Sequence, residues 1–197
     1  MTWVVIGVTL LFAWLATRDR KMVPGPWQMI AELLVDWFKE LVRDALGEAY
    51  EERYFPLICA LFIFLLFCNW IGVIPGLEEP TKDLNTTLGL GLMGFVIAHG
   101  TAIKVKGLKE YVKEYFEPMF FLAPLNVVGE IAKVISISFR LFGNIMGGSI
   151  IIIVVSHLIW GLLLPPFLYA FFALFVGTVQ AFVFMMLTLV YISVQIR

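Results

Sequence analysis

The sequence predicts an all-α membrane protein with five transmembrane helices and one amphipathic helix at the membrane surface. Hydrophobic residues make up 61% of the 197 residues, charged residues only 15%, and the mean hydropathy is +0.93, as is typical of membrane proteins. Long apolar runs alternate with short segments that contain Pro, Gly and charged residues. The positive charges also gather on one predicted side of these runs. We expect a single membrane domain over residues 1–197.

The composition argues against several other kinds of site. The net charge is −1 and no basic run is present, so nucleic acid is not an expected partner. Cys59 and Cys68 lie in one apolar helix, too far apart to form a disulfide with each other. His99 and His157 stand alone, without the spacing of metal ligands. We therefore expect no metal and no cofactor.

The first two elements are a short span and an amphipathic helix. Residues 1–17 are apolar and precede Arg18, Arg20 and Lys21, whereas a signal peptide carries its positive charges before the apolar run. We expect a transmembrane helix that starts outside, and its length, at the lower limit for a crossing, leaves open whether the native chain begins further upstream. Residues 27–46 mix charges with apolar residues at helical spacing, which favours an interfacial helix. A soluble helix that binds a partner is the alternative.

Residues 55–74 and 88–103 are the second and third predicted spans. The first of them ends with Asn69, and an Asn at such a place is often only a helix–helix hydrogen bond. The connection holds Asp83 and Asn85, which by themselves are ordinary helix caps in a solvated loop.

A basic loop is expected at residues 104–113, where it would meet the edge of a neighbouring polypeptide or lipid headgroups on the cytoplasmic side. We interpret His99, just before it, as structural rather than as a proton carrier. The predicted helix at 127–160 is too long to stand upright, because about 28 residues from Glu130 onward extend roughly 42 Å against a core of about 30 Å. We expect it to be tilted. Residues 167–196 form the last long helix.

Arg140 lies in the middle of the 127–160 helix, and we expect it to be the functional centre. A charged side chain at the bilayer centre costs about 2.5 to 3.5 kcal/mol on insertion scales, so it is rarely present without a use. At about 100° per residue its helix face is small and polar. The residues on this face are Lys133, Ser136, Ile137, Gly143, Asn144 and Gly147. Another helix could approach this low-relief surface closely.

The sequence offers Arg140 no acidic partner at its own depth. Glu130 is the only Asp or Glu after residue 117, and it lies about 15 Å away along the helix. Residues 55–74 and 84–98 contain none. We expect the counter-charge to come from another polypeptide. Because Arg stays protonated, its expected work is to favour the ionised form of a passing carboxylate, which would then release its cation.

A purely structural interpretation of the same residues remains open. In it, Gly143 and Gly147 form a helix-packing seam, and Arg140 pairs with a buried carboxylate without any transport role.

Motifs along nearly the whole chain resemble subunit a of F-type ATP synthases. The most specific is Ser138-Phe-Arg140-Leu-Phe-Gly-Asn144 followed by Gly148; Thr81-x-Asp83-Leu-Asn85-x-Thr87 and Gln180-Ala-Phe-Val-Phe also match. The resemblance implies a non-catalytic stator subunit in the bacterial inner membrane. Its implied partners are the c-subunit ring, the b-subunit peripheral stalk and, through the stalk, the F1 sector. It also implies that the last two helices tilt strongly against the ring, with Arg140 facing the ring carboxylate and Gln180 close by.

Two offset half-paths for protons or sodium ions are implied as well. We expect the outer path to be lined by Asn69, Asp83, Asn85, Asn144, Ser149 and Gln180, and the inner path to run past Glu130 and Lys133. Many subunits a carry a Glu nine residues after the Arg, or a Glu or His seven before the Gln, where this chain has Ser149 and Ala173. Neither can titrate, so we expect a water-filled outer path. Without the resemblance, Gln180 is equally a buried amide that makes one interhelical hydrogen bond.

Charge asymmetry predicts the orientation. We expect an outside N-terminus, five crossings and a cytoplasmic C-terminus. In this topology Lys82 is the only Lys or Arg in the segments on the outer side. The cytoplasmic positive charges are Arg18, Arg20, Lys21, Lys39, Arg43, Arg53, Lys104, Lys106, Lys109, Lys113 and Arg197.

Two other functions compete with a stator subunit. A stand-alone secondary transporter or ion channel with an Arg140 site would show internal repeats and broken helices near the midplane, and the sequence shows neither. A structural membrane scaffold would keep its function after Arg140→Ala.

Overall fold

The computed structural model describes residues 1–18, 25–74, 77–116, 123–158 and 164–196, and within these ranges the secondary structure is helical. The α-helices are α1 (Thr2–Arg18), α2 (Pro26–Leu46), α3 (Glu48–Trp70), α4 (Leu84–Lys106), α5 (Leu108–Phe116), α6 (Ala123–Leu158), α7 (Leu164–Ala170) and α8 (Gly177–Ile196). A π-helix (Phe171–Val176) joins α7 to α8, and two 3-10 turns (Ile71–Val73 and Pro80–Lys82) lie between α3 and α4.

Four helical segments in the described part of the chain are long and apolar enough to cross a membrane. They are Glu48–Val73, Leu84–Lys106, Ala123–Leu158 and Pro166–Ile196. The apolar part of α1, Thr2–Leu15, is shorter. The predicted all-α membrane class is thus confirmed, whereas a fifth crossing through α1 stays a prediction.

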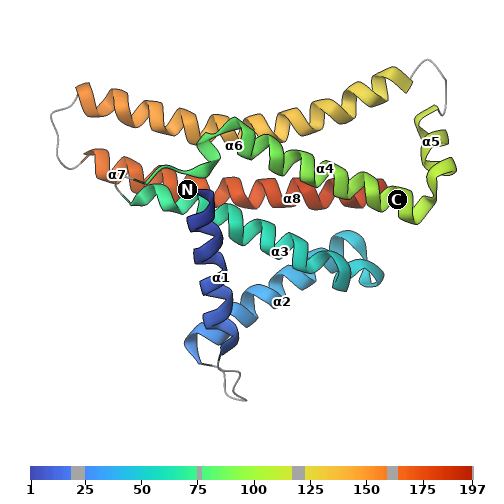
Figure 1. Ribbon diagram of the computed structural model, residues 1–197, viewed down its shortest axis with the longest axis horizontal. Helices are drawn as coiled ribbons and strands as arrows, with labels where there is room; N and C mark the ends of the chain where they lie inside the picture. Colours follow the sequence, from blue (N-terminus) through green and yellow to red (C-terminus); the bar gives the residue numbers. More distant parts are fainter. Residues whose placement is uncertain (19–24, 75–76, 117–122, 159–163, 197) are drawn as a thin grey trace.

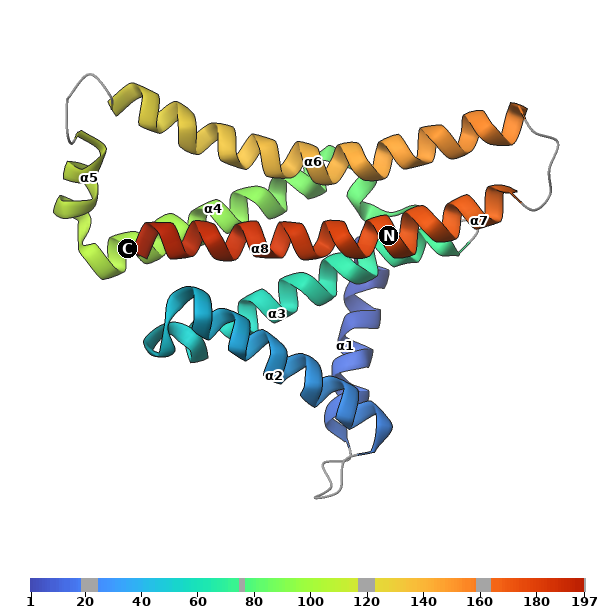
Figure 2. The same cartoon turned by 180° about the vertical axis from the view of Figure 1, so that it is seen from behind.

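Helix α8 runs through the centre of the molecule. Figures 1 and 2 show it between α6 and α4 on one side and α3 on the other, and α8 contacts all three of them as well as α2. Helix α1 runs across the direction of α6 and α8. The C-terminal ends of α4 and α8, the whole of α5 and the start of α6 lie at one end of the molecule, and the end of α6 and the start of α7 lie at the other.

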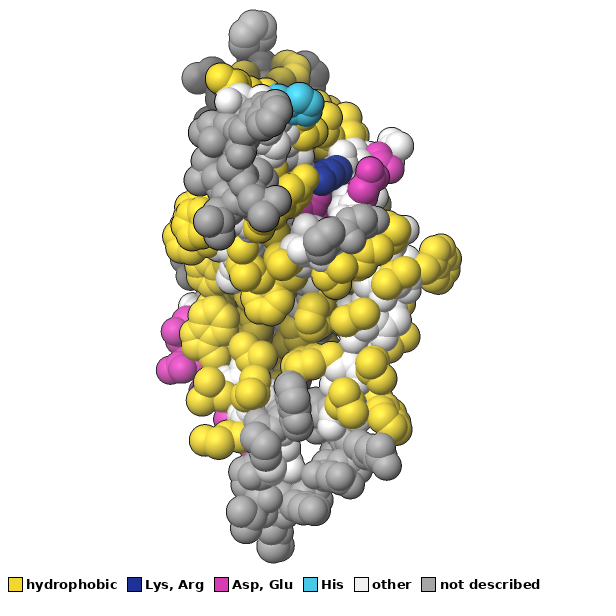
Figure 3. Space-filling view, turned by 90° about the vertical axis from the view of Figure 1, so that its left-hand side faces the viewer, with side chains coloured by type: hydrophobic (Ala, Val, Ile, Leu, Met, Phe, Trp, Pro, Cys, Tyr) yellow, Lys and Arg dark blue, Asp and Glu magenta, His cyan; other side chains and the backbone are white. Residues whose placement is uncertain are grey.

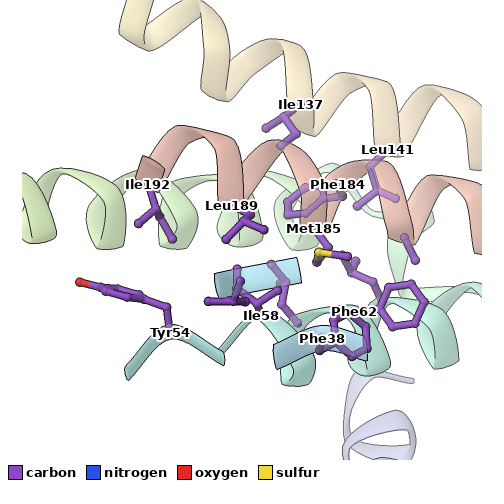
Figure 4. Close-up of a cluster of buried hydrophobic side chains, with 14 of the residues drawn as sticks. Phe38, Tyr54, Ile58, Phe62, Ile137, Leu141, Phe184, Met185, Leu189 and Ile192 are labelled. Carbon is purple, nitrogen blue, oxygen red and sulfur yellow. The ribbon is translucent and has the colours of Figure 1, made fainter. Parts of the chain in front are cut away.

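The larger of two apolar core clusters in the described part of the chain lies around α8 (Figure 4), and a smaller one contains Val5, Cys68 and Ile71. Phe184, Met185 and Leu189 are almost completely buried against Ile58 of α3 and Leu141 of α6. Lipid tails are as apolar as these side chains, so the hydrophobic effect gives little attraction between helices inside a bilayer. Close van der Waals packing holds such helices together instead. Substitutions that leave a cavity in this cluster should therefore weaken the helix bundle.

The outer surface is rich in apolar side chains. Large hydrophobic residues are exposed on every long helix, for example Trp3, Val96, Leu125 and Phe175. Figure 3 looks at the end where α6 terminates, and hydrophobic side chains cover most of the described surface there. Soluble monomers rarely expose apolar patches of more than a few hundred Å², so this surface suits a lipid environment.

The expected basic loop at residues 104–113 is wrong, because the segment is helical. Helix α4 continues to Lys106, and Gly107 ends it with a φ of 85° and an N–H bond to the Ile103 carbonyl at 3.0 Å. A left-handed φ is costly for residues with a Cβ and free for Gly. Helix α5 then begins at Leu108, and its charged and apolar residues recur at helical spacing.

The amphipathic segment folds as α2, close to its expected bounds. Gly47, with a φ of 86°, turns the chain directly into α3, and Arg43 Nε donates to Glu51 Oε2 across this turn at 2.7 Å. The positions of Arg20, Lys21, residues 159–160 and Arg197, which entered the predicted topology and helix bounds, lie outside the described residues.

Candidate functional site

Arg140 sits on the face of α6 that points away from the core. Its side chain is exposed, whereas its neighbour Leu141 is completely buried. Within the described ranges, no Asp or Glu lies within ion-pair distance of the guanidinium, and it makes no hydrogen bond to them or to other side chains there. Glu130, the nearest acid along α6, is bonded instead to Lys133 at 2.6 Å. The positive charge of Arg140 is therefore presented outward.

The helix face around Arg140 is open. A Cβ atom built on Gly143 or on Gly147 would meet nothing within 4 Å, so no described part of this chain covers these glycines. Gly148, on the other side of α6, is different: a Cβ there would lie 2.7 Å from the Phe172 ring. One side of α6 is thus packed within the chain, while the side that carries Arg140 is free to receive a partner helix.

Asn144 and Gln180 connect α6 to α8 beside Arg140. Asn144 Nδ2 donates to Gln180 Oε1 at 2.7 Å. Gln180 is only 3% exposed, and its Nε2 has no hydrogen-bond partner among the described atoms. Asn144 lies one turn after Arg140 on the same face of α6. The fold therefore brings together two of the residues that were expected to line the outer path.

Asn69 joins three separate elements. It is completely buried; its Nδ2 donates to the Gly177 carbonyl at 2.8 Å, and its Oδ1 accepts from Thr81 Oγ1 at 2.8 Å. Gly177 directly follows the π-helix, and a Cβ on it would lie 2.8 Å from Asn69 Cβ. Glycine is needed here for this close approach. Both hydrogen-bonding ends of the Asn69 amide are thus used inside the protein.

The remaining predicted outer-path residues do not gather around one point by hydrogen bonding. Asp83 Oδ1 accepts from the Asn85 N–H at 2.9 Å and caps the N-terminus of α4, and both side chains are exposed. Ser149 Oγ donates to the Ile145 carbonyl one turn earlier on α6, at 3.1 Å.

Glu130 is the centre of a polar cluster built from four helices. Its Oε1 accepts from Lys133 Nζ at 2.6 Å and from Gln195 Nε2 of α8 at 3.4 Å. Its Oε2 lies 3.6 Å from His99 Nε2 of α4. The other ring nitrogen of His99, Nδ1, is hydrogen-bonded to Tyr111 Oη of α5 at 2.6 Å. We call these five residues the Glu130 cluster.

Two cavities meet at this cluster. The smaller cavity, of about 120 Å³, is the more enclosed of the two, and we call it the enclosed cavity. It lies between α4, α6 and α8 and is lined by His99, Glu130, Lys133, Ile137 and Gln195, among others. The open cavity, of about 350 Å³, is lined by Asn126, Glu130, Lys133 and Gln195, among others. Glu130 lines both, whereas neither is lined by Arg140. The enclosed cavity reaches Ile137, one helical turn before Arg140.

Sequence reasoning found Glu130 and Lys133 but missed the other members of the cluster. His99 was interpreted as structural, although its predicted depth near the inner end of its helix matched that of Glu130. Tyr111 fell in the segment expected to be a loop. Gln195 gave no signal, because an amide near the end of an apolar helix is ordinary.

Both the family model and the individual relatives that match this chain are ATP synthase subunits of one kind. The family model described as ATP synthase A chain matches residues 1–193. ATP synthase subunit a of Acidothermus cellulolyticus is 38% identical over 95% of this chain and 70% of its own length. The proteins of the same name from Desulforamulus reducens and Moorella thermoacetica are each 36% identical over 98% of this chain, and the matches cover 76% and 87% of their lengths.

Proposed function

The chain belongs to the ATP synthase A chain family, and on this premise we propose that it carries ions to and from a rotating ring of c subunits through two offset half-paths. Members of this family are non-catalytic subunits of the membrane sector, and ATP chemistry takes place in the soluble F1 sector. The chain itself therefore makes and breaks no covalent bonds of ATP. We propose the two half-paths as its ion route and Arg140 as the residue that drives ion release from the ring.

The observation that carries the proposal is the outward-facing charge of Arg140. Its guanidinium has no acidic partner in the described ranges, and the glycines on its face leave room for a neighbouring helix. A carboxylate of the ring passing within about 4 Å would be stabilised in its ionised form by about 4 kcal/mol at an effective dielectric constant of about 20. That energy disfavours the ion-loaded carboxyl and drives release of its ion.

The inner half-path is the pair of cavities at Glu130. The open cavity would connect the cytoplasm to the Glu130 carboxylate, and the enclosed cavity continues past Lys133 as far as Ile137. An ion released beside Arg140 would leave through this route. Because neither cavity is lined by Arg140 itself, the released ion would first cross from its ring carboxylate to the Ile137 end of the enclosed cavity.

The outer half-path would use the polar residues at the other end of α6 and near the start of α4. We propose that Ser149, Asp83 and Asn85 contact its water, and that Asn144 and Gln180 form its inner limit beside Arg140. Asn69 is buried and hydrogen-bonded at both ends of its amide, so its proposed part is to hold α3, the 3-10 turn at Pro80–Lys82 and α8 together along this path.

The proposed orientation places the N-terminus outside a bacterial inner membrane and the C-terminus in the cytoplasm. The clustering of the C-terminal ends of α4 and α8 with α5 and the start of α6 supports this, since all of these segments carry predicted cytoplasmic positions (Figure 1). The b-subunit stalk and the F1 sector complete the proposed set of partners.

Cross-linking to the ring tests the proposal. Cys59 and Cys68 are first replaced by Ser, and one new cysteine is placed at Gly143 or Gly147, opposite a cysteine next to the carboxylate of the c subunit. We expect a disulfide between the two subunits that stops ATP-driven rotation until it is reduced. Gly7→Cys is the matched control, because Gly7 on α1 is equally uncrowded but lies far along the chain from Arg140. If Gly143 and Gly147 cross-link no better than Gly7, the ring does not run along this face.

A further inference from the structure

We propose that His99 is a proton-carrying residue of the inner half-path, and that it passes protons between the enclosed cavity and Glu130. This inference rests on the proposed function and adds two things to it. It assigns a second titratable group to the path, and it identifies the translocated ion as a proton rather than sodium.

The position of His99 is that of a group between two compartments. The imidazole is 9% exposed and lines the enclosed cavity but is not among the residues that line the open one. Glu130 lines both, and its Oε2 faces His99 Nε2 at 3.6 Å. A cavity of about 120 Å³ with polar groups on its wall has room for a few water molecules. Protons in this water therefore reach His99 and Glu130 before they reach the open cavity.

The ring of His99 is held in one orientation. Tyr111 Oη bonds Nδ1 at 2.6 Å, and the Phe95 ring lies edge-on with its centroid 3.9 Å away. These contacts leave Nε2 directed at the Glu130 carboxylate. When Nδ1–H donates to Tyr111, Nε2 has a free lone pair and can accept a proton.

The charged and titratable groups around the imidazole favour onward transfer. Tyr111 faces it from α5, Glu130 and Lys133 from α6, and Tyr191 and Gln195 lie on the α8 wall of the enclosed cavity. Lys133 stays bonded to Glu130 Oε1 at 2.6 Å, so the carboxylate keeps one oxygen occupied by a cation and the other, Oε2, available to His99.

The transfer conserves protons at every step. A hydronium ion in the enclosed cavity gives its proton to Nε2, which breaks one O–H bond and forms one N–H bond. The imidazolium then gives this proton to Glu130 Oε2, and Nε2 regains its lone pair. Glu130 finally releases the proton to water in the open cavity. Tyr111 keeps its own proton throughout, and the sequence runs in reverse when ATP hydrolysis drives pumping.

The test compares His99→Gln with His157→Gln in membranes that contain the whole ATP synthase. These are the two histidines of the chain, and His157 is exposed on the far part of α6, where its Nδ1 lies 2.9 Å from the Ile153 carbonyl. Gln can form hydrogen bonds to both Tyr111 and Glu130 but cannot carry a proton. ATP-driven proton pumping is measured at several values of inner pH, and each rate is divided by that of the control variant so that effects on F1 cancel.

We expect His99→Gln to pump about tenfold more slowly than His157→Gln, since a positioned acid–base group contributes about 10²-fold or more and cavity water replaces part of it. The step in the pH profile that comes from the His99 imidazole should disappear. Tyr111→Phe should move this step without removing it.

Three results would overturn the inference. The first is a His99→Gln variant that has the pumping rate and pH profile of the control. This result would count against the inference even if His99→Ala abolished pumping, because His99 would then have only a structural role. The second is ATP-driven transport of sodium in place of protons. The third is a Tyr111→Phe variant that leaves the step where it is. In each case loss of pumping in Arg140→Ala would show that the proposed function itself still holds.

Discussion

Asn144 Nδ2 donates a hydrogen bond to Gln180 Oε1 at 2.7 Å, and this bond joins α6 to α8 one helical turn from Arg140. It fixes the two long helices relative to each other at the level where the arginine faces outward. Arg140 can act on a moving carboxylate only if its own helix does not move, so this contact is part of the proposed mechanism.

The Asn144–Gln180 bond should contribute measurable coupling between α6 and α8. We expect Asn144→Ala and Gln180→Ala each to lower the thermal stability of the detergent-solubilised complex, and the double variant to lose less than the sum. A coupling of about 0.5 to 1.5 kcal/mol is expected for one partly buried hydrogen bond. Strictly additive losses would mean that the two amides act independently.

Gly147 and Gly148 should respond in opposite ways to the same added methyl group. Gly148→Ala would press on the Phe172 ring at 2.7 Å and should destabilise the isolated subunit by about 1 to 3 kcal/mol. Gly147→Ala has open space around it and should leave subunit stability unchanged while it slows ring rotation. Thermal unfolding of the subunit and ATP-driven pumping measure the two effects separately. Equal destabilisation by both would contradict the open face.

The buried amide of Asn69 should be important for stability rather than for conduction. Asn69→Leu removes its bonds to the Gly177 carbonyl and to Thr81 and leaves the buried Thr81 hydroxyl without this partner. A buried polar group left unpaired costs about 1 to 3 kcal/mol, so less assembled complex is expected in membranes. Pumping per assembled complex, measured after quantifying the subunit on blots, should change little. A large loss per assembled complex would instead place Asn69 in the ion path.

Glu130 should be needed for conduction but not for the shape of the cavity. Glu130→Gln keeps the size of the side chain and its bond to Gln195 but loses the charge that binds Lys133 at 2.6 Å. We expect ATP-driven pumping to fall by about tenfold or more, since one positioned proton-transfer group is lost. Asn126→Ala, which alters the wall of the open cavity and leaves the net charge of the chain unchanged, is the comparison. Unchanged pumping in Glu130→Gln would remove Glu130 from the inner path.

The parts of the fold that follow from helical periodicity were predictable. The apolar runs gave the helical class and several spanning segments, and the family resemblance implied that Gln180 lies close to Arg140, whose helix face also carries Asn144. Glu130 and Lys133, three residues apart on one helix, meet as local geometry requires.

The features that sequence reasoning missed depend on long-range contacts or on subtle backbone changes. The π-helix at Phe171–Val176 lies inside an apolar run with no Pro or Gly to mark it, and only the fold shows that Gly177 after it receives Asn69. Helix α5 was not predicted because four lysines, at positions 104, 106, 109 and 113, suggested a loop. The pairing of His99 with Glu130 joins residues 31 positions apart, and no local pattern indicates it.

The most direct test of the account is ATP-driven ion pumping by membranes that carry Arg140→Ala or Arg140→Lys, compared with membranes that carry the unchanged chain. Assembly is checked first by co-purification of the c subunit. Near-complete loss of pumping is expected in both variants with the complex still assembled, because Ala removes the charge and Lys replaces the broad guanidinium with a compact, more easily deprotonated amine. Normal pumping by an assembled Arg140→Ala complex would contradict the account.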